Sequence, residues 1–281
     1  MKIIILGILL FFVSCNEKQR SIVLAGDSWA AFTCTLHSID DSLKNAGVVN
    51  AATNASCNAT TLIGMHAEDW LKSNFHKATL VSLQDPSVQI LYLSLGGNDL
   101  INMWNRSMSL DQENEMSLEI KKRLNDIVTV YQALRPDIKI LISGYDFPRF
   151  TPDHPILAYR KAYLQMGSPS ALELNTMLMR FSKVMTSLSN GKNVFYIHHL
   201  GVMQYYFGNS EGGLEPLSTL NPDFISPANQ PERGGGAPEL LTAASAMLST
   251  EGVVDAFHLS RNGYDKLADH SVRNYIKAWL Q

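Results

Sequence analysis

Three short patches, far apart in the chain, carry side chains that could together catalyse acyl transfer. Ser28 follows an apolar run that ends in Gly26, and Asn98 follows a second apolar run that ends in two glycines. Asp255 and His258 lie three positions apart near the C-terminus. Acyl transfer needs a nucleophile, a hydrogen-bond donor for the developing oxyanion, and a base oriented by a carboxylate. These four side chains are of the types that supply those parts.

Each patch alone also has an ordinary structural explanation. A serine at a strand-to-helix turn, such as Ser28, is commonly a helix cap. The run Gly96-Gly97-Asn98-Asp99 is typical of a turn, and an Asp-x-x-His pair is often a capping or surface pair. It is the combination, with two patches each placed directly after an apolar strand, that favours a catalytic interpretation.

The hydrophobic pattern predicts a chain of strands alternating with helices. We expect strands over residues 21–25, 48–52, 88–95, 138–143 and 194–197, and helices over residues 29–46, 60–75, 110–134, 171–188 and 261–280. This alternation is typical of βαβ units, and it predicts a three-layer α/β/α domain with a mainly parallel five-stranded sheet. Catalytic loops of such a sheet lie at the carboxyl ends of its strands, where Ser28 and Asn98 are expected.

Two segments interrupt the alternation, near residues 145–169 and 208–238. Both are rich in proline, and we interpret them as loop insertions that form either a lid or binding wall, or a solvated surface feature. The second contains Gly208-Asn209-Ser210-Glu211-Gly212, which matches the G-x-S-x-G nucleophile elbow. The elbow requires a helix next, and the glycine and proline that follow argue against one.

Composition limits the classes of function. A chain of 281 residues with 46% hydrophobic and 17% charged residues can bury the core of one α/β domain. Its formal net charge of -3 and its lack of basic runs indicate no positively charged surface that could bind nucleic acid, so we expect no nucleic-acid partner. The spacing of the histidines matches no metal site, and we expect neither a metal nor another cofactor.

The N-terminus has the pattern of an export signal. Lys2 is followed by an apolar run over residues 3–13, which is too short to span a bilayer comfortably and suits the core of a signal peptide. The sequence Phe12-Val13-Ser14-Cys15 resembles a bacterial lipobox. That resemblance implies a lipoprotein signal peptide over residues 1–14, a lipidated Cys15, a tether over 15–20, and a membrane-anchored protein in the periplasm or on the cell surface. The alternative is an ordinary cleaved signal peptide.

Either kind of signal exports the protein to an oxidising compartment. The two remaining cysteines, Cys34 and Cys57, could therefore form a disulfide. Two small buried thiols are the alternative, since spacing does not show that they meet.

Taken in order, the three patches resemble the blocks of the GDSL or SGNH hydrolase family. The matching stretches are Val23-Leu24-Ala25-Gly26-Asp27-Ser28, Gly96-Gly97-Asn98-Asp99 and Asp255-Ala256-Phe257-His258-Leu259-Ser260. The resemblance covers a single domain over residues 21–281 and implies the flavodoxin-like fold of that family. It also implies that Ser28 is the nucleophile, His258 the general base and acid, and Asp255 its orienter. Asn98 and the backbone amide of Ser28 would bind the oxyanion.

The chain departs from the family in its second block, which usually supplies a glycine to the oxyanion hole. The nearest alignment, through residues 56–60, puts Asn58 at that position. Asparagine tolerates a positive φ better than most residues with a side chain, so we expect its amide to complete the site.

The expected function is that of a serine esterase that hydrolyses carboxylic esters through an acyl-enzyme. Its substrate would be an acylated carbohydrate, a lipid or another small ester. Two alternatives remain open at this point. One is an acyltransferase that uses a sugar hydroxyl as acceptor, and the other is a non-catalytic glycan-binding lipoprotein of the cell surface.

Overall fold

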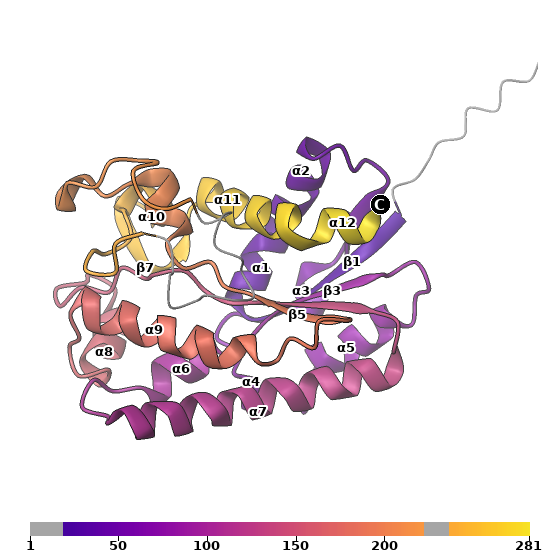
Figure 1. Ribbon diagram of the computed structural model, residues 1–281, viewed down its shortest axis with the longest axis horizontal. Coiled ribbons are helices and arrows are strands. Elements are labelled where there is room, and N and C mark those ends of the chain that lie inside the picture. Colours follow the sequence, from indigo (N-terminus) through magenta and orange to yellow (C-terminus); the bar gives the residue numbers. More distant parts are fainter. Residues whose placement is uncertain (1–18, 222–235) are drawn as a thin grey trace, which may run out of the picture.

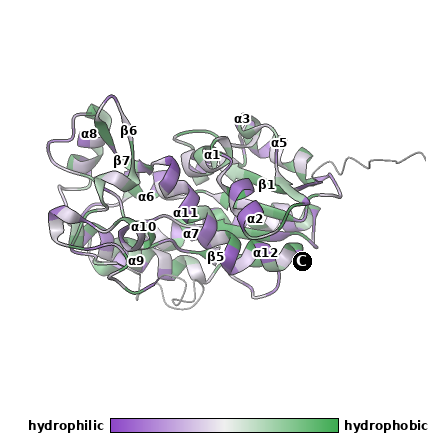
Figure 2. Cartoon of the chain, turned by 90° about the horizontal axis from the view of Figure 1, so that it is seen from above, coloured by the Kyte–Doolittle hydropathy of each residue, from purple (hydrophilic) through white to green (hydrophobic). Residues whose placement is uncertain are grey.

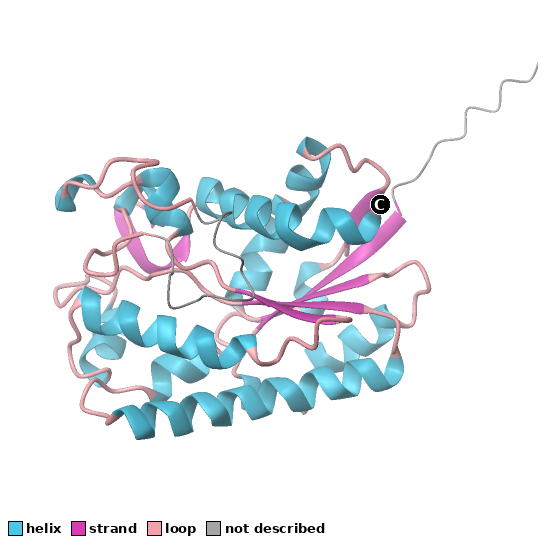
Figure 3. Cartoon of the chain, in the orientation of Figure 1, coloured by secondary structure: helices cyan, strands magenta, loops and turns pink. Residues whose placement is uncertain are grey.

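The computed structural model describes residues 19–221 and 236–281. The predicted signal peptide, the lipidation site Cys15 and most of the tether lie outside the described residues, as does part of the second insertion. Five parallel strands form the central sheet in the order β2-β1-β3-β4-β5, between two layers of helices (Figure 3). The strands are β1 (Gln19–Gly26), β2 (Ala51–Thr53), β3 (Ile90–Ser94), β4 (Lys139–Ser143) and β5 (Val194–Ile197). The predicted three-layer α/β/α fold is confirmed.

Side chains that alternate along each strand form the two faces of this sheet. Ile22 and Leu24 of β1 pack with Ile90 of β3 in one core, whereas Val23 packs with Leu91 in the other. The first core is covered by α2 (Ser38–Asn45) and by the C-terminal helices α11 (Arg261–Ser271) and α12 (Lys277–Leu280), which a π turn over Val272–Ile276 connects. The second is covered by α5 (Asn74–Leu83), α7 (Leu110–Leu134) and α9 (Ala171–Thr186) (Figure 1).

The covering helices are amphipathic, as this arrangement requires. Strand β1 is mostly hydrophobic in Figure 2, whereas α2 and α11 carry many hydrophilic residues. In α2, Ile39 and Leu43 lie four positions apart and are fully buried. That spacing places both side chains on the face of the helix that meets the sheet.

The strand order places a natural crevice between β1 and β3. The chain moves from β1 outward to β2 and then returns to β3 on the other side of β1, so the connections after β1 and β3 leave in opposite directions. Gly26 and Ser94 pair at the carboxyl ends of these strands. The segments that carry Ser28 and Asn98 therefore emerge on the two sides of one opening.

Two predicted helices are wrong in detail. The helix expected over residues 29–46 is two helices, α1 (Ser28–Thr35) and α2, because His37 between them adopts a left-handed conformation with φ 58°. The helix expected over residues 60–75 is absent as such. Its place is taken by α3 (Cys57–Thr60), α4 (Ala67–Trp70) and a loop through Gly64, whose φ is +78°. A left-handed glycine ends helical geometry, which a count of apolar positions does not detect.

The C-terminal patch with Asp255 and His258 lies on a β-hairpin rather than on a turn before the last helix. Strands β6 (Met247–Thr250) and β7 (Val253–Leu259) form an antiparallel pair beside the main sheet. Glu251 and Gly252 connect them with φ values of 52° and 82°, the two positive angles of a type I′ hairpin turn. Asp255 and His258 therefore project from a strand whose register the turn fixes.

Other helices surround the strand ends. The segment predicted as the first loop insertion contains α8 (Leu157–Gln165), and the remaining helices are α6 (Gly97–Met103) and α10 (Val202–Phe207), with 3-10 turns at Ser210–Gly212 and Ala244–Ala246. The structure contains the disulfide between Cys34 and Cys57, with Cα atoms 5.7 Å apart, which links α1 to α3. In the described ranges, every helix is too short or too polar to cross a bilayer.

The close approach of β1 to β3 depends on Gly26. A Cβ atom there would lie 1.8 Å from the carbonyl oxygen of Ser94, and the φ of Gly26 is +132°. We expect Gly26→Ala to lower the free energy of unfolding by more than about 4 kcal/mol, since the clash is with backbone. Gly252→Ala is the matched control, because Gly252 also has a positive φ but nothing within 4 Å. The control should cost roughly 1 kcal/mol in urea unfolding, and equal losses for the two variants would contradict the steric argument.

Candidate active site

The structure brings Ser28, His258 and Asp255 together at the carboxyl end of β1. Ser28 is the first residue of α1, and its Oγ lies 2.9 Å from Nε2 of His258. Nδ1 of the same imidazole lies 3.1 Å from Oδ2 of Asp255. The imidazole is thus placed to take the proton of the alcohol on Nε2, while the carboxylate orients the ring through Nδ1.

Hydrogen bonds hold Asp255 as an ionised acceptor. Oδ1 accepts from the backbone amides of Phe257 and His258, each at 2.7 Å, and Oδ2 accepts from Tyr159 at 2.7 Å. Burial alone disfavours the charge, but the hydrogen bond and the charge interaction with His258 outweigh it, and the pKa of Asp255 lies below its usual value. Because an ionised carboxylate only accepts, the imidazole carries its hydrogen on Nδ1, which leaves Nε2 free to accept from Ser28.

Behind Ser28 lies a fully buried carboxylate, Asp27. Its Oδ1 accepts from the amide of Trp29 at 3.0 Å and so caps α1, and it also accepts from the hydroxyl of Ser94 at 3.3 Å. Its Oδ2 accepts from the hydroxyl of Tyr145, whose oxygen in turn accepts from the amide of Gly97 at 2.9 Å. Burial raises the pKa of Asp27 to about 6, although these hydrogen bonds lower it part of the way back. This network joins the ends of β1, β3 and β4.

Asn98 lies on the opposite side of the opening from Ser28 and contributes to the same cavity. Its Nδ2 donates one hydrogen to the carbonyl of Met65 at 3.0 Å, which fixes the amide plane and leaves the second hydrogen for another acceptor. The neighbouring Asp99 is buried and accepts from the amide of Ala67 at 2.7 Å and from Arg123 at 2.7 Å. Asn98 and Asp99 together hold the loop over residues 62–66 against the site.

The structure does not bring Asn58 to this cavity. Asn58 is exposed on α3, whereas Gly64, six positions later, lines the cavity beside Ser28. Gly64 adopts a φ of +78°, and it is the only glycine between Gly47 and Gly96. The presence of a single glycine in this stretch could have indicated the position from the sequence, because a backbone donor in a left-handed turn favours glycine over asparagine.

A cavity of about 270 Å³ opens over Ser28 and His258. Its other walls are mostly apolar and come from the loop of Gly64, from α6 and α8, and from the segment before α8. They include Ile63, Ile101, Phe150, Ala158, Tyr159, Ala162 and Phe257. The segment predicted as a loop insertion thus contributes one wall of the cavity, including two aromatic residues that the sequence did not single out.

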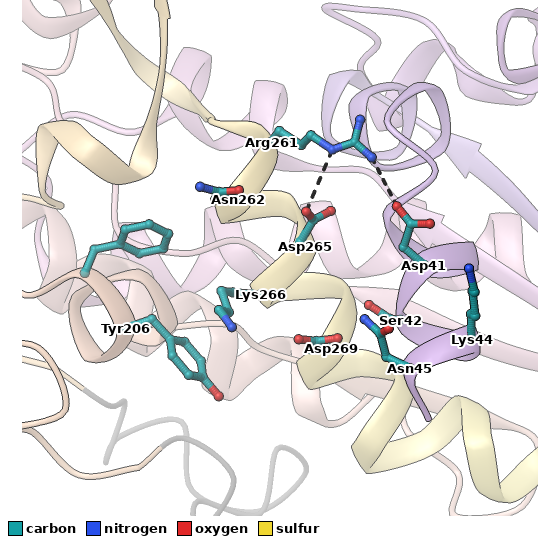
Figure 4. A pocket seen from close by; sticks show the side chains of 11 residues that line it. Asp41, Ser42, Lys44, Asn45, Tyr206, Arg261, Asn262, Asp265, Lys266 and Asp269 are labelled. Carbon is teal, nitrogen blue, oxygen red and sulfur yellow. Dashed lines mark hydrogen bonds and ion pairs between the residues drawn. The ribbon is translucent and has the colours of Figure 1, made fainter. Parts of the chain in front are cut away.

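A larger hollow of about 600 Å³ lies elsewhere, between α2, α10 and α11, and it is lined by charged and polar side chains (Figure 4). Arg261 in that hollow pairs with Asp41 at 3.1 Å and lies 4.0 Å from Asp265. Neither Ser28 nor His258 lines it. The serine of the alternative motif, Ser210, is exposed on a 3-10 turn and is followed by a loop, so it does not form a nucleophile elbow.

Comparison with known proteins identifies the family. The model of the family described as GDSL-like Lipase/Acylhydrolase matches residues 22–271, which confirms the resemblance that the three patches indicated. An extracellular lipase from Streptomyces rimosus has a similar structure, with a TM-score of 0.50 and 12% identity over 90% of this chain and 98% of the lipase. An acetyl xylan esterase gives a TM-score of 0.49 and 16% identity over 91% of this chain and 99% of the esterase. No curated protein sequence matches this chain.

The Asp27 network yields a stability prediction. Tyr145→Phe would leave the amide of Gly97 and one oxygen of Asp27 without a partner in the interior, and we expect it to lower the free energy of unfolding by about 2–3 kcal/mol. Tyr196→Phe is the control, since Tyr196 donates only to the hydroxyl of Ser182 at 3.2 Å, and it should cost about 1 kcal/mol.

The pH dependence of that loss has a definite sign. The pKa of Asp27 is about 6 in the folded protein and 3.8 ordinarily, so its ionisation opposes folding and the stability it contributes falls as pH rises through about 6. Removing the hydrogen bond from Tyr145 raises this pKa further. We therefore expect the difference between Tyr145→Phe and wild type in urea unfolding to be larger at pH 8 than at pH 5. A difference in the free energy of unfolding that stays constant or shrinks as pH rises would show that the ionisation of Asp27 does not depend on Tyr145.

Proposed function

The chain belongs to the GDSL-like lipase/acylhydrolase family, and from this premise we propose that it is a serine esterase that hydrolyses carboxylic esters through an acyl-enzyme. The observation that carries the proposal is the connected set of Ser28 Oγ, His258 Nε2, His258 Nδ1 and Asp255 Oδ2, with distances of 2.9 and 3.1 Å. Ser28 and His258 of this set line one cavity. These contacts have the geometry that a nucleophile, a base and its orienter need.

The proposed reaction proceeds in two halves. As Ser28 Oγ bonds to the ester carbonyl carbon, its hydrogen moves to His258 Nε2, and the carbonyl electron pair moves to the oxygen. That oxyanion would accept hydrogen bonds from the amide of Ser28, the side chain of Asn98 and the amide of Gly64, in the place assigned above to Asn58. The carbonyl then re-forms, the bond to the alcohol oxygen breaks, and His258 gives its proton to that oxygen. Water repeats the sequence on the acyl-enzyme, which releases the acid and restores Ser28.

The cavity favours a short acyl group. Its volume of about 270 Å³ lies just below the ~300–1,000 Å³ typical of small-molecule sites, and it must hold both sides of the ester bond. Phe150, Ile101 and Phe257 separate it from an apolar cluster that includes Met166 and Leu178, where only about 10 Å³ is accessible to a water molecule. A long acyl chain would meet this packed wall.

We further propose that the esterase is exported. The disulfide between Cys34 and Cys57 is stable in an oxidising compartment, and the similar lipase from Streptomyces rimosus is described as extracellular. Lipidation at Cys15 stays a prediction from the sequence. The open mouth of the cavity suits a small ester or an ester group on a glycan or lipid.

The first test of the proposal is hydrolysis of p-nitrophenyl esters by the purified protein. We expect acetate and butyrate to be hydrolysed and Ser28→Ala to lose about 10⁴-fold or more in kcat, because no other hydroxyl contacts His258 Nε2 at the described positions. A fluorophosphonate should label Ser28. The control Ser210→Ala should retain full activity, and labelling at Ser210 or at no serine would remove the assignment. Measuring the acid released with and without a sugar acceptor distinguishes hydrolysis from acyl transfer.

A second test concerns the wall at Phe150. Phe150→Leu replaces the ring between the cavity and the apolar cluster by a smaller side chain, and Met166 and Met177 of that cluster adapt readily to a new occupant. We expect kcat/KM for octanoate relative to butyrate to rise about 5- to 20-fold, the value of roughly one to two buried methylene groups.

The matched control for that test is Phe181→Leu, a buried phenylalanine of α9 that does not line the catalytic cavity. It should cost similar stability and leave the chain-length ratio unchanged. If Phe181→Leu changes the ratio as much as Phe150→Leu does, the preference does not arise at the proposed wall.

A further inference from the structure

Tyr159 lies between the two residues that activate the nucleophile. It comes from α8, about a hundred positions before them in the chain, and its hydroxyl donates to Asp255 Oδ2 at 2.7 Å. The same hydroxyl oxygen lies 3.0 Å from His258 Nδ1, while the direct distance from Nδ1 to Oδ2 is 3.1 Å. The three polar atoms therefore form a closed triangle in which each is within hydrogen-bond distance of the other two.

The direction of each hydrogen bond in the triangle follows from the charges. Burial, together with the hydrogen bond to Asp255 and its negative charge, raises the pKa of Tyr159, so its hydroxyl keeps its hydrogen. Asp255 is ionised and accepts, so the Tyr159 hydrogen points to Oδ2. The lone pairs of the phenol oxygen are then directed elsewhere, and one faces the Nδ1 hydrogen of His258. That hydrogen consequently has two acceptors.

The ring of Tyr159 is held in place from two sides. His154 and Phe150 both meet it edge to face, with ring centroids 5.1 and 6.0 Å away. His154 also bridges to the strand that carries Asp255, because its Nδ1 accepts from the amide of Ile156 at 3.1 Å and its Nε2 then donates to the carbonyl of Val254 at 2.9 Å. The segment that leads into α8 is thus attached to β7 beside the catalytic pair.

We propose that Tyr159 is a positioning residue of the esterase. It fixes the relative orientation of the Asp255 carboxylate and the His258 imidazole, and it connects α8 to both residues. The inference rests on the proposed function, since it assigns a role within that reaction. Tyr159 has a second contact with the reaction, because it also lines the cavity. Its contribution to orientation must therefore be separated from its contribution to substrate binding.

Few polar or charged groups lie near the imidazole of His258 in the described part of the chain. Asp255 and Tyr159 lie at Nδ1, and Ser28 lies at Nε2. Asp27 interacts with His258 through its charge from behind α1, and Tyr264 of α11 stacks on Phe32, which packs against the imidazole. When the Tyr159 hydroxyl is removed, Asp255 loses a donor and the Nδ1 hydrogen of His258 loses one of its two acceptors.

The variant Tyr159→Phe tests the proposal with the full mature chain. We expect kcat for p-nitrophenyl butyrate to fall about 3- to 10-fold, the value of one typical hydrogen bond, while KM stays within about twofold. The acid limb of the kcat profile should shift. Tyr163→Phe is the matched control: Tyr163 is half-buried on the same helix and, among the described residues, its hydroxyl bonds to neither Asp255 nor His258. It should leave kcat and the profile unchanged.

A proton NMR spectrum separates failure of this inference from failure of the proposed function. The Nδ1 hydrogen of His258 should give a downfield signal that shifts in Tyr159→Phe and not in Tyr163→Phe, whether or not any ester is hydrolysed. An unchanged signal and pH profile in Tyr159→Phe would overturn the positioning role. So would a loss confined to KM, because that result assigns Tyr159 to the cavity wall alone. A wild-type protein inert toward every ester, with the signal shifted as expected, would instead contradict the esterase proposal.

Discussion

The buried carboxylate of Asp27 is the constraint on which the geometry of the site depends. It caps the helix that begins with the proposed nucleophile Ser28, and through Tyr145 it fixes the amide of Gly97 at the start of the segment that carries Asn98. One ionisable group thus aligns elements that follow β1, β3 and β4. Burying it is unfavourable, as its pKa of about 6 shows, and its donors from Trp29, Tyr145 and Ser94 compensate for the lost water. The polar network is therefore a structural requirement beneath Ser28.

A second set of interactions positions the other side of the opening. The chain after β3 supplies Asn98, which bonds to the carbonyl of Met65, and Asp99, which joins the amide of Ala67 to Arg123 of α7. These contacts shape the loop in which Gly64 takes its left-handed conformation. Asn98 thus has two uses for its two amide hydrogens, one structural and one available to the cavity. The proposed oxyanion donors are coupled, since displacing Asn98 would also release the loop of Gly64.

Sequence patterns predicted the parts of this protein that follow local rules. The five strands of the sheet and the helix α7 could be predicted because short apolar runs and helical spacing are local signals, and Ser28 and Asn98 followed from strand ends. The segment after β2 could not, because its conformation depends on a single glycine and on contacts with Asn98 and Asp99. The hairpin of β6 and β7 was missed because its turn, Glu251-Gly252, lacks the usual Asn-Gly or Asp-Gly signal. Tyr159 was beyond local reasoning, since its partners are about a hundred residues away.

The placement of Asp255 and His258 on a strand gives the insertion that contains α8 its importance. A carboxylate and an imidazole on a free turn could reorient together, whereas on β7 the backbone is fixed and Oδ1 of Asp255 is held by two amides of the same strand. Only Oδ2 then remains to orient the imidazole, and only a group from outside the strand can adjust it. Tyr159 is that group, and the same insertion supplies Phe150 at the wall of the cavity. In the proposed reaction, the sheet therefore fixes where the chemistry occurs, while the insertion controls how the base is held and how large an acyl group fits beside it.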